Sequence, residues 1–322
     1  MKAIVTDGYA EPERLRLSDL PVPTPGPGQV LVQVHHTTIN DYDWSLVRGR
    51  PYPYRLLFGW RKPAYPVPGI ELSGTVAGTG PGVDGLPEGT LVFGDISHGG
   101  WGSWAEYVVV SAGDLRVRPP DVSSTTAAAL PHAGQLAWQA LFGEGQLTEG
   151  GHVLINGAGG GVGAVALQLA KSHGATVTGV DSASKLASMR ELGFDRVIDY
   201  RVDDFTRLEQ TYDLIVDAKT TRSAFAYARV LRPGGRYVTV GGHLTRLLAL
   251  PMQKVFTDRS MHIVALRPNR DLDALLDRCR AGQLQPVVDG PYALADVPRL
   301  LRYFGEGRHH GKIVIEVSTP AL

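Results

Sequence analysis

A glycine-rich segment in the middle of the chain constrains the fold more than any other feature. Residues His152 to Gly163 read HVLINGAGGGVG, and an apolar, helix-forming stretch follows from Val165 to Ala170. A buried strand that turns through glycines into a helix is typical of a dinucleotide-binding βαβ unit. Because glycine has no side chain, backbone N–H groups there can approach a pyrophosphate, and the helix N-terminus adds a favourable partial charge.

The turn follows the pattern G-x-G-x-x-G with alanine in the first position. The next apolar strand ends at Asp181, 18 residues after Gly163, where the fingerprint expects an acidic residue. The alternative, a tight turn in a flavodoxin-like domain that binds nothing, agrees less well with this context. We therefore expect the turn to contact a dinucleotide through Ala158, Gly159, Gly160, Gly161, Val162 and Gly163.

The residues around Asp181 leave the choice of cofactor open. A carboxylate at this strand end would accept a hydrogen bond from the ribose 2′-hydroxyl of NAD and repel a 2′-phosphate. Ser182, Lys185, Tyr200 and Arg201 instead offer hydroxyl donors and positive charge, which suit NADP. From these residues alone NAD and NADP are nearly balanced.

The pattern of strands and helices predicts two domains. Between about residues 123 and 264 strands and helices alternate, which indicates a parallel sheet covered on both faces. The first 120 residues are short strand-forming runs between glycine and proline clusters, and a final strand, Ile313 to Val317, needs a sheet to join. We therefore expect a mainly-β domain of residues 1–122 and 265–322, interrupted by an α/β domain of residues 123–264.

Composition excludes several classes of protein. With 32 Lys+Arg against 32 Asp+Glu there is no net charge to hold a nucleic acid. The lone Cys279 excludes a disulfide framework or a multi-cysteine zinc cluster, and it fits a reducing cytoplasm. No apolar run approaches the roughly 20 residues of a membrane span, and the N-terminal residues do not read as a signal peptide. We expect a soluble, cytoplasmic protein with neither nucleic-acid nor membrane partners.

Seven motifs occur in order along nearly the whole chain and carry a family resemblance. They are Asn40 to Trp44, Pro68 to Gly74, Ala105 to Tyr107, Ala129 to Leu141, Pro233 to Arg236, Gly241-Gly242 and Gly311 to Val314. Together with the glycine turn, they resemble the zinc-independent branch of the medium-chain dehydrogenase/reductases, the quinone oxidoreductase and enone reductase group. The resemblance implies a GroES-like mainly-β catalytic domain with an inserted Rossmann domain. It also implies an NAD(P)H-dependent oxidoreductase that forms homodimers, with Tyr237 to Gly242 as a candidate sheet edge.

The chain departs from the zinc-containing members at the positions of the metal ligands. Those members have a cysteine in the segment Asn40 to Asp43 and a histidine at Ile70, and neither residue occurs here. A catalytic zinc needs about three protein ligands. The pairs His35-His36 and His309-His310 do not replace them, because neighbours on a strand face opposite ways. We predict no metal.

Without zinc, a developing oxyanion must be stabilised by hydrogen bonds, which suits reduction of a quinone or an α,β-unsaturated carbonyl. Asn40 and Asp43 would position the ribose and nicotinamide, and Tyr42 is the candidate proton donor. The resemblance, rather than Asp181, favours NADP(H) over NAD(H). It adds cofactor contacts at Asn40, His132, Gln135, Ala218, Val240, Gly241, Gly242, Leu266 and Lys312.

The segment Arg48 to Tyr65 is longer and richer in basic and aromatic residues than the family pattern. Its rings could line an apolar substrate pocket or pin a loop to the surface. Its basic residues could recognise an acidic substrate tail or be solvated. Two other functions therefore stay open: an enoyl-thioester reductase acting on carrier-bound or coenzyme A substrates, and a cofactor-binding protein without turnover. The rings in question, with two just before the segment, are Tyr42, Trp44, Tyr52, Tyr54, Phe58 and Trp60.

Overall fold

The computed structural model describes residues 1–241 and 259–318, and within them the chain forms two compact units. One unit consists of Met1–His132, Pro268–Leu272 and Val288–Leu322, and the other of Ala133–Arg267 and Asp273–Val287. The domain limits expected after residues 122 and 264 stay a prediction. No helix in the described ranges is long and apolar enough to cross a membrane.

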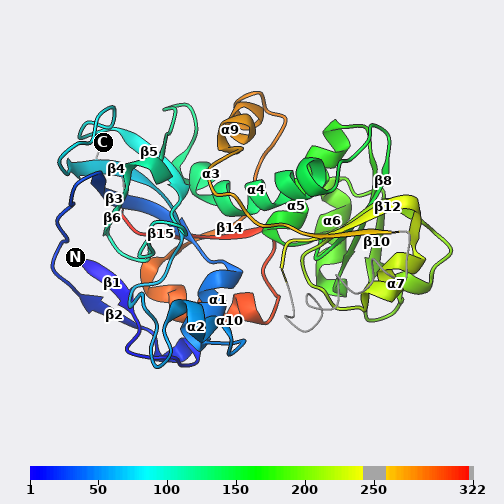
Figure 1. Ribbon diagram of the computed structural model, residues 1–322, viewed down its shortest axis with the longest axis horizontal. Coiled ribbons are helices and arrows are strands. Elements are labelled where there is room, and N and C mark those ends of the chain that lie inside the picture. The colour runs from blue at the N-terminus through cyan, green and yellow to red at the C-terminus, as the bar shows by residue number, and fades with distance from the viewer. Residues whose placement is uncertain (242–258, 319–322) are drawn as a thin grey trace. The chain divides into compact units, whose positions relative to one another are not determined.

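The first unit is built on a seven-stranded sheet in the order β14-β15-β3-β4-β5-β7, with β6 also paired to β3, and a separate two-stranded sheet joins β1 and β2. Helices α1, α2, α3 and α10 belong to the same unit (Figure 1). The strands are β1 (Lys2–Val5), β2 (Arg16–Asp19), β3 (Gln29–Thr38), β4 (Glu71–Thr79), β5 (Leu91–Asp95), β6 (Tyr107–Ser111), β7 (Arg116–Val117), β14 (Val288–Ala293) and β15 (Lys312–Glu316). The helices are α1 (Asp41–Arg48), α2 (Tyr54–Phe58), α3 (Ser124–Ala129) and α10 (Val297–Gly305).

The last strand joins the N-terminal sheet. β15 pairs antiparallel with β3, where Val314 lies opposite Thr38 and Glu316 opposite His36. This confirms the expectation that the strand at the end of the chain completes the β region at its start. The first unit is therefore closed by residues that are far apart in the sequence.

Helix α1 was not identified from the sequence, which predicted a mainly-β region over the first 120 residues. It begins after Asn40, whose extended backbone forms a capping box with Asp43, and it ends at Gly49, which has a left-handed φ of 56°. The sequence features that mark this helix are therefore the capping residues at its two ends, because eight residues are too few to establish a clear helical period.

The second unit contains a six-stranded sheet in the order β10-β9-β8-β11-β12-β13. Each described pair is parallel, and numbered along the sheet this is the 3-2-1-4-5-6 order of dinucleotide-binding folds. Helix α5 packs on β8 and β9, α6 on β10 and α7 on β12 (Figure 1). The strands are β8 (His152–Asn156), β9 (Thr176–Asp181), β10 (Arg196–Asp199), β11 (Tyr212–Asp217), β12 (Leu231–Thr239) and β13 (Ser260–Ile263). The helices are α4 (Pro131–Trp138), α5 (Gly161–Ser172), α6 (Leu186–Leu192), α7 (Ala224–Arg229) and α9 (Leu272–Arg280).

The two sheets confirm the predicted fold class, a mainly-β unit combined with a doubly wound α/β unit. The predicted sheet edge at Tyr237 to Gly242 is wrong, however. Strand β12 pairs with β11 on one side and with β13 on the other, so it is an interior strand. Among the described residues β13 is the last strand on that side of the sheet.

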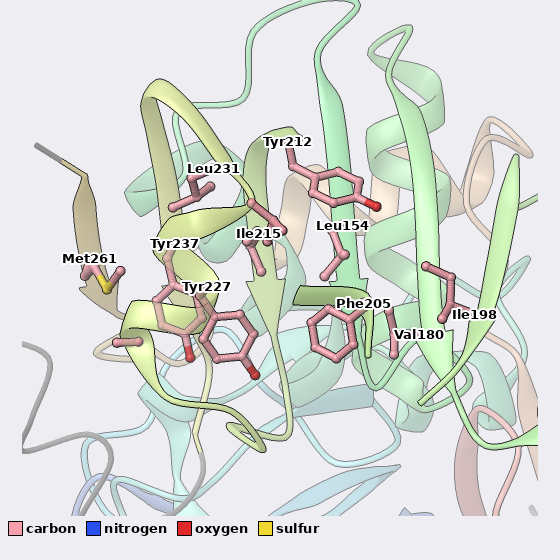
Figure 2. Packing of buried hydrophobic residues seen from close by; sticks show 12 residues of the cluster. Leu154, Val180, Ile198, Phe205, Tyr212, Ile215, Tyr227, Leu231, Tyr237 and Met261 are labelled. Carbon is pink, nitrogen blue, oxygen red and sulfur yellow. The ribbon is translucent and has the colours of Figure 1, made fainter. Parts of the chain in front are cut away.

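Buried side chains of several strands and of α7 form one core in the second unit. The rings of Tyr227 and Tyr237 lie 4.6 Å apart between their centroids, and Phe205 packs beside Tyr227. Figure 2 shows the hydroxyls of Tyr227 and Tyr237 at one end of this cluster and Tyr212, the first residue of β11, at the other. The aromatic core therefore brings two phenol hydroxyls to the end of the sheet where β11 finishes.

Candidate functional site

The glycine turn lies between β8 and α5. Gly157 has a left-handed φ of 86°, which turns the chain away from the strand, and Gly160 is the residue before the helix. At Gly163 an added Cβ would stand 2.5 Å from the Cα of Ala158, so the helix lies directly against the turn. The N-terminus of α5 thus lies against the glycine turn that follows β8, and such a turn leading into a helix, the glycine cradle, fits a pyrophosphate.

Asp181 ends β9 beside this turn. Its Oδ2 accepts a hydrogen bond from the backbone N–H of Gly159 at 2.9 Å, and its Oδ1 accepts one from the N–H of Ser182 at 2.8 Å. The Lys185 Nζ lies 3.8 Å from Asp181 Oδ2, and the lysine side chain is only 1% exposed. Asp181 and Lys185 therefore form a buried ion pair, which packs against the glycine turn.

Two further residues predicted to contact the cofactor lie next to Asp181. Strand β10 pairs with β9 so that Asp199 is opposite Asp181, and the following residue, Tyr200, donates its backbone N–H to the Asp181 carbonyl at 3.3 Å. The guanidinium of Arg201 lies 5.7 Å from the Tyr200 ring. Four polar residues therefore follow the carboxyl ends of β9 and β10. They are the hydroxyl-bearing Ser182 and Tyr200 and the cations Lys185 and Arg201.

A buried carboxylate that the sequence analysis missed lies at the carboxyl end of β11. Asp217 is wholly buried, and its Oδ1 accepts a hydrogen bond from Asn156 Nδ2 at 2.8 Å. Ala218 donates its N–H to the carbonyl of Asn156 at 2.9 Å, and Val240 donates its N–H to the carbonyl of Asp217 at 3.1 Å. The signal that identified Asp181, a polar residue at the end of an apolar strand, would also have identified Asp217 and Asn156.

The other residues of the second unit that were predicted to contact the cofactor lie on several different elements. Gln135 is buried in α4, Leu266 is half-buried after β13, and Gly241 follows β12. Gly242 lies outside the described residues. Among the predicted contacts in this unit, Gly159 and Asp181 are in direct contact through a hydrogen bond.

In the first unit three predicted residues surround Glu71, a wholly buried carboxylate that the sequence analysis did not assign to the site. Lys312 Nζ lies 2.6 Å from Glu71 Oε2, and Asn40 Nδ2 donates to the same oxygen at 2.8 Å. Asn40 Oδ1 in turn accepts from Lys312 Nζ, and the His132 backbone N–H donates to Glu71 Oε1 at 2.6 Å. A buried ion pair therefore brings Asn40, His132 and Lys312 together from distant parts of the chain.

Asp43 acts on this cluster through the backbone. Its Oδ2 accepts from the N–H of Asn40 at 2.8 Å, and its Oδ1 accepts from the N–H of Gly69 at 3.0 Å. Burial raises the pKa of the Asp43 carboxyl to about 7, although both hydrogen bonds oppose this rise. The carboxyl ties the start of α1 to the turn before β4 and so fixes the position of Asn40.

Tyr42 lies beside His132 in the first unit. The two rings meet edge to face with centroids 5.4 Å apart, and His132 Nδ1 is 2.8 Å from Asp95 Oδ2. Burial would raise the pKa of Asp95, but hydrogen bonds from His132 and Ser97 outweigh it and the net pKa is lowered. Burial also raises the pKa of Tyr42, so its hydroxyl stays protonated and able to donate near neutral pH.

Three rings, those of Tyr42, Phe58 and Tyr65, pack on Trp101, which was not among the aromatic residues predicted from the sequence. Tyr65 stacks on Trp101 at 5.6 Å between centroids, and Phe58 lies at the same distance but tilted. Tyr52 and Trp60 are instead exposed, at 62% and 69%. The rings therefore anchor part of the segment Arg48 to Tyr65 to the first unit.

Two arginines of the same segment have defined partners. The guanidinium of Arg48 lies 4.0 Å from the centre of the Trp44 ring and its Nε 3.5 Å from Glu11. The guanidinium of Arg55 stacks over Tyr9 at 4.3 Å. The exposed basic residues of the segment are Arg50, Arg61 and Lys62.

Across residues 1–241 and 259–318, no three histidine, cysteine, aspartate or glutamate side chains converge on a point that could hold a metal ion. His35 and His36 are buried, and their ring nitrogens lie near the hydroxyls of Thr75 and Ser124. Burial raises the pKa of Cys279 to about 11, which disfavours the thiolate.

The chain matches two family models that together span most of its length. Residues 26–120 match the alcohol dehydrogenase GroES-like domain, and residues 192–315 match the zinc-binding dehydrogenase model. The 2-methylene-furan-3-one reductase of Solanum lycopersicum is 30% identical over 98% of this chain and 79% of its own length. The NADPH-dependent alkenal/one oxidoreductase of Arabidopsis thaliana, a chloroplastic protein, is 29% identical over the same shares.

Solved structures agree with these relatives. The quinone oxidoreductase from Coxiella burnetii has a TM-score of 0.89 and 27% identity, with 99% of each chain covered. It shares both the GroES-like domain and the parallel sheet. Dehydrogenases of this kind act with a nicotinamide cofactor, which fits the glycine cradle described above. The chain therefore belongs to the medium-chain dehydrogenase/reductase family, in its quinone oxidoreductase group, and is an oxidoreductase.

Proposed function

We propose that this enzyme reduces quinones or α,β-unsaturated carbonyls with NADPH and without zinc. The observation that carries the proposal is the carboxyl edge of the parallel sheet, where the glycine cradle meets an Asp181 carboxylate already paired with Lys185. The relatives named for enone, alkenal and quinone substrates support the class of reaction.

The preference for NADPH follows from how Asp181 is bonded. Its two oxygens are occupied by the backbone N–H groups of Gly159 and Ser182, and Lys185 lies close enough to balance its charge. The carboxylate is therefore less able to accept a ribose 2′-hydroxyl or to repel a 2′-phosphate. Lys185, Tyr200 and Arg201 would supply the phosphate with charge and hydrogen bonds.

When bound, the nicotinamide supplies a hydride. The residues of this chain then have three tasks. Asn40 and Lys312, held by Glu71, position the cofactor, and Asp43 keeps Asn40 in place. The Tyr42 hydroxyl stays protonated and donates a proton to the reduced substrate. This set suits an enone or a quinone, whose oxyanion needs only hydrogen bonds. Oxidation of an alcohol would need a base or a Lewis acid to remove its proton.

The test is NADPH consumption by the purified enzyme with a benzoquinone, a short enone, an enoyl thioester and, with NADP⁺, a primary alcohol. We expect turnover with the quinone and the enone and none with the alcohol. Turnover with the alcohol alone would overturn the proposal. Cofactor binding without turnover on any substrate would indicate a binding protein instead.

An enoyl-thioester reductase remains the second candidate, and its supporting observation is the group of exposed cations Arg50, Arg61 and Lys62. Replacing all three by glutamine should raise KM for a coenzyme A thioester and leave KM for a small quinone unchanged. A KM for the thioester that is unchanged from wild type, or that rises by the same factor as KM for the quinone, would remove this candidate.

We further propose a homodimer and a cytoplasmic location. The homodimer follows from the family resemblance, and the cytoplasmic location follows from the single cysteine, which agrees with a reducing compartment. Light scattering coupled to gel filtration checks the first, because a monomer mass would contradict it. Fractionation of cells followed by immunodetection checks the second.

A further inference from the structure

The buried carboxylate of Asp217 lies where the strand order of the second unit reverses. Strands β8 and β11 are neighbours there, and in such sheets ligands bind beyond the carboxyl ends of the strands at this point. Asp217 Oδ1 accepts from Asn156 Nδ2 at 2.8 Å, and Oδ2 accepts from the Tyr237 hydroxyl at 2.8 Å. Asn156 at the end of β8 and Asp217 at the end of β11 are thus hydrogen-bonded to each other where the dinucleotide is expected.

The same carboxylate shapes the loop that follows β11. Oδ1 also accepts from the backbone N–H of Lys219 at 2.9 Å and of Thr220 at 2.8 Å. Thr220 has a left-handed φ of 48°, a conformation that is costly for a β-branched residue. Such strain persists only where the surroundings impose it, and it is concentrated at ligand-binding sites.

Asp217 connects three backbone segments that carry predicted cofactor contacts. The loop touches the glycine turn, because a Cβ added at Gly157 would lie 3.3 Å from the Ala218 Cβ. The Asp217 carbonyl accepts from Val240 N–H, and the Thr220 hydroxyl donates to the Gly241 carbonyl at 3.3 Å. A shift of the carboxylate would therefore move the turn, the loop and the end of β12 together.

The phenol of Tyr237 is a fixed donor to this carboxylate. Burial raises the pKa of Tyr237, and the negative charge of Asp217 raises it further, so the hydroxyl remains protonated throughout the working pH range. Asn156 Nδ2 also donates to the Tyr227 hydroxyl at 3.3 Å. The Tyr237 phenol and the Asn156 amide therefore act as the fixed hydrogen-bond donors of this cluster.

We infer that Asp217, held by Tyr237 and Asn156, is a positioning residue for the nicotinamide half of the dinucleotide. The inference rests on the proposed function and deepens it. The adenosine half is expected at Asp181, beyond β9, and a dinucleotide crosses the point where the strand order reverses. The other half then extends over β11 and β12, where Asp217 orders the backbone.

The test compares two variants that each remove one buried phenol hydroxyl from the same core. Tyr237→Phe removes the donor to Asp217, whereas Tyr212→Phe alters a ring at the opposite end of the cluster (Figure 2). Replacing Asp217 itself would remove four hydrogen bonds at once and could prevent folding. For each variant, dissociation constants are measured for NADPH and for 2′,5′-ADP, a fragment that carries only the adenosine half.

We expect Tyr237→Phe to weaken NADPH on the order of tenfold, as loss of a buried hydrogen bond to a charged group allows, and to leave 2′,5′-ADP unchanged. Tyr212→Phe should change neither constant. Equal weakening of both ligands by Tyr237→Phe would show a general structural defect, and unchanged NADPH binding would show no role. Either result overturns the inference.

The wild-type affinities for NADPH and NADH show separately whether the proposed choice of cofactor is wrong. If the wild type binds NADH and not NADPH, that choice is wrong, and the same comparison is made with NADH and 5′-AMP. Selective loss of NADH binding in Tyr237→Phe would then still support the positioning role. A wild type that binds no dinucleotide would overturn both the proposed function and this inference.

Discussion

Replacing Lys185 by methionine separates the charge of this residue from its packing. The lysine stem lies against the glycine turn, where a Cβ added at Gly159 would be 2.6 Å from Lys185 Cδ. Methionine keeps an unbranched apolar stem of similar length and removes only the ammonium. Lys185→Met should therefore keep the apolar packing against the turn, while it removes the cation that balances Asp181 and that would face a 2′-phosphate.

The expected loss follows from the surroundings of the ammonium. The side chain is 1% exposed, so water screens its charge little. A charge-assisted hydrogen bond is worth roughly 1.5–3 kcal/mol, which corresponds to a loss of about 10- to 150-fold in NADPH affinity. NADH has no 2′-phosphate, and its affinity should change by less than about threefold, within the ordinary scatter of such substitutions.

The measurement is titration of wild type and Lys185→Met with NADPH and NADH, followed by the fluorescence of the bound nucleotide. Lys171→Met is the matched control, because Lys171 also pairs with a carboxylate, Asp195 at 2.8 Å, but on the exposed surface. It should change neither affinity. Equal losses of NADPH and NADH in Lys185→Met, or a wild-type preference for NADH, would refute the reasoning and show that Asp181 selects the cofactor.

Three further outcomes are expected. Gly163→Ala places a Cβ 2.5 Å from the Ala158 backbone. Urea unfolding should show a free energy of unfolding lower by about 1–3 kcal/mol, and cofactor binding should be lost. A free energy of unfolding and a cofactor affinity equal to those of the wild type would contradict the close contact. The Asp43 pKa of about 7 exceeds its unfolded value, so its contribution is fully present below about pH 4 and is lost as pH rises through 7, by up to about 4 kcal/mol. Urea unfolding from pH 4 to 8 should show this fall in the wild type and a flatter profile in Asp43→Asn, and equal slopes would exclude Asp43 as the source. Elemental analysis should find no stoichiometric zinc, and a chelator should leave activity intact; zinc-restored activity would contradict this.

The sequence was most informative where local chemistry determines local structure. The glycine turn and Asp181 were identified because their spacing is set by one βαβ unit, and the structure has them in contact. The final strand was also assigned correctly to the N-terminal sheet, because an apolar strand must pair with a neighbour. These predictions depended on short stretches of chain or on a general rule.

The features that could not be predicted depend on contacts between segments that are far apart in the sequence. Glu71 joins Asn40 and Lys312 because three separate elements meet, and no spacing in the sequence shows this. Likewise β12 is an interior strand only because β13 pairs with it. Helix α1 was missed for another reason, since its capping residues rather than a hydrophobic period define it.

The pairing of β15 with β3 also determines the order in which the two units can mature on the ribosome. The second unit takes most of its residues from 133–267 and its last from 273–287, so its chain is complete before Lys312 emerges. Until then β3 lacks a neighbour at Thr38, and Glu71 lacks the ammonium that balances its buried charge. Domains tend to fold as soon as their residues are available, and unpaired strand edges invite association. During synthesis the α/β unit therefore has all of its residues before the β unit has β15, and the unpaired edge of β3 is the surface that a chaperone would need to cover.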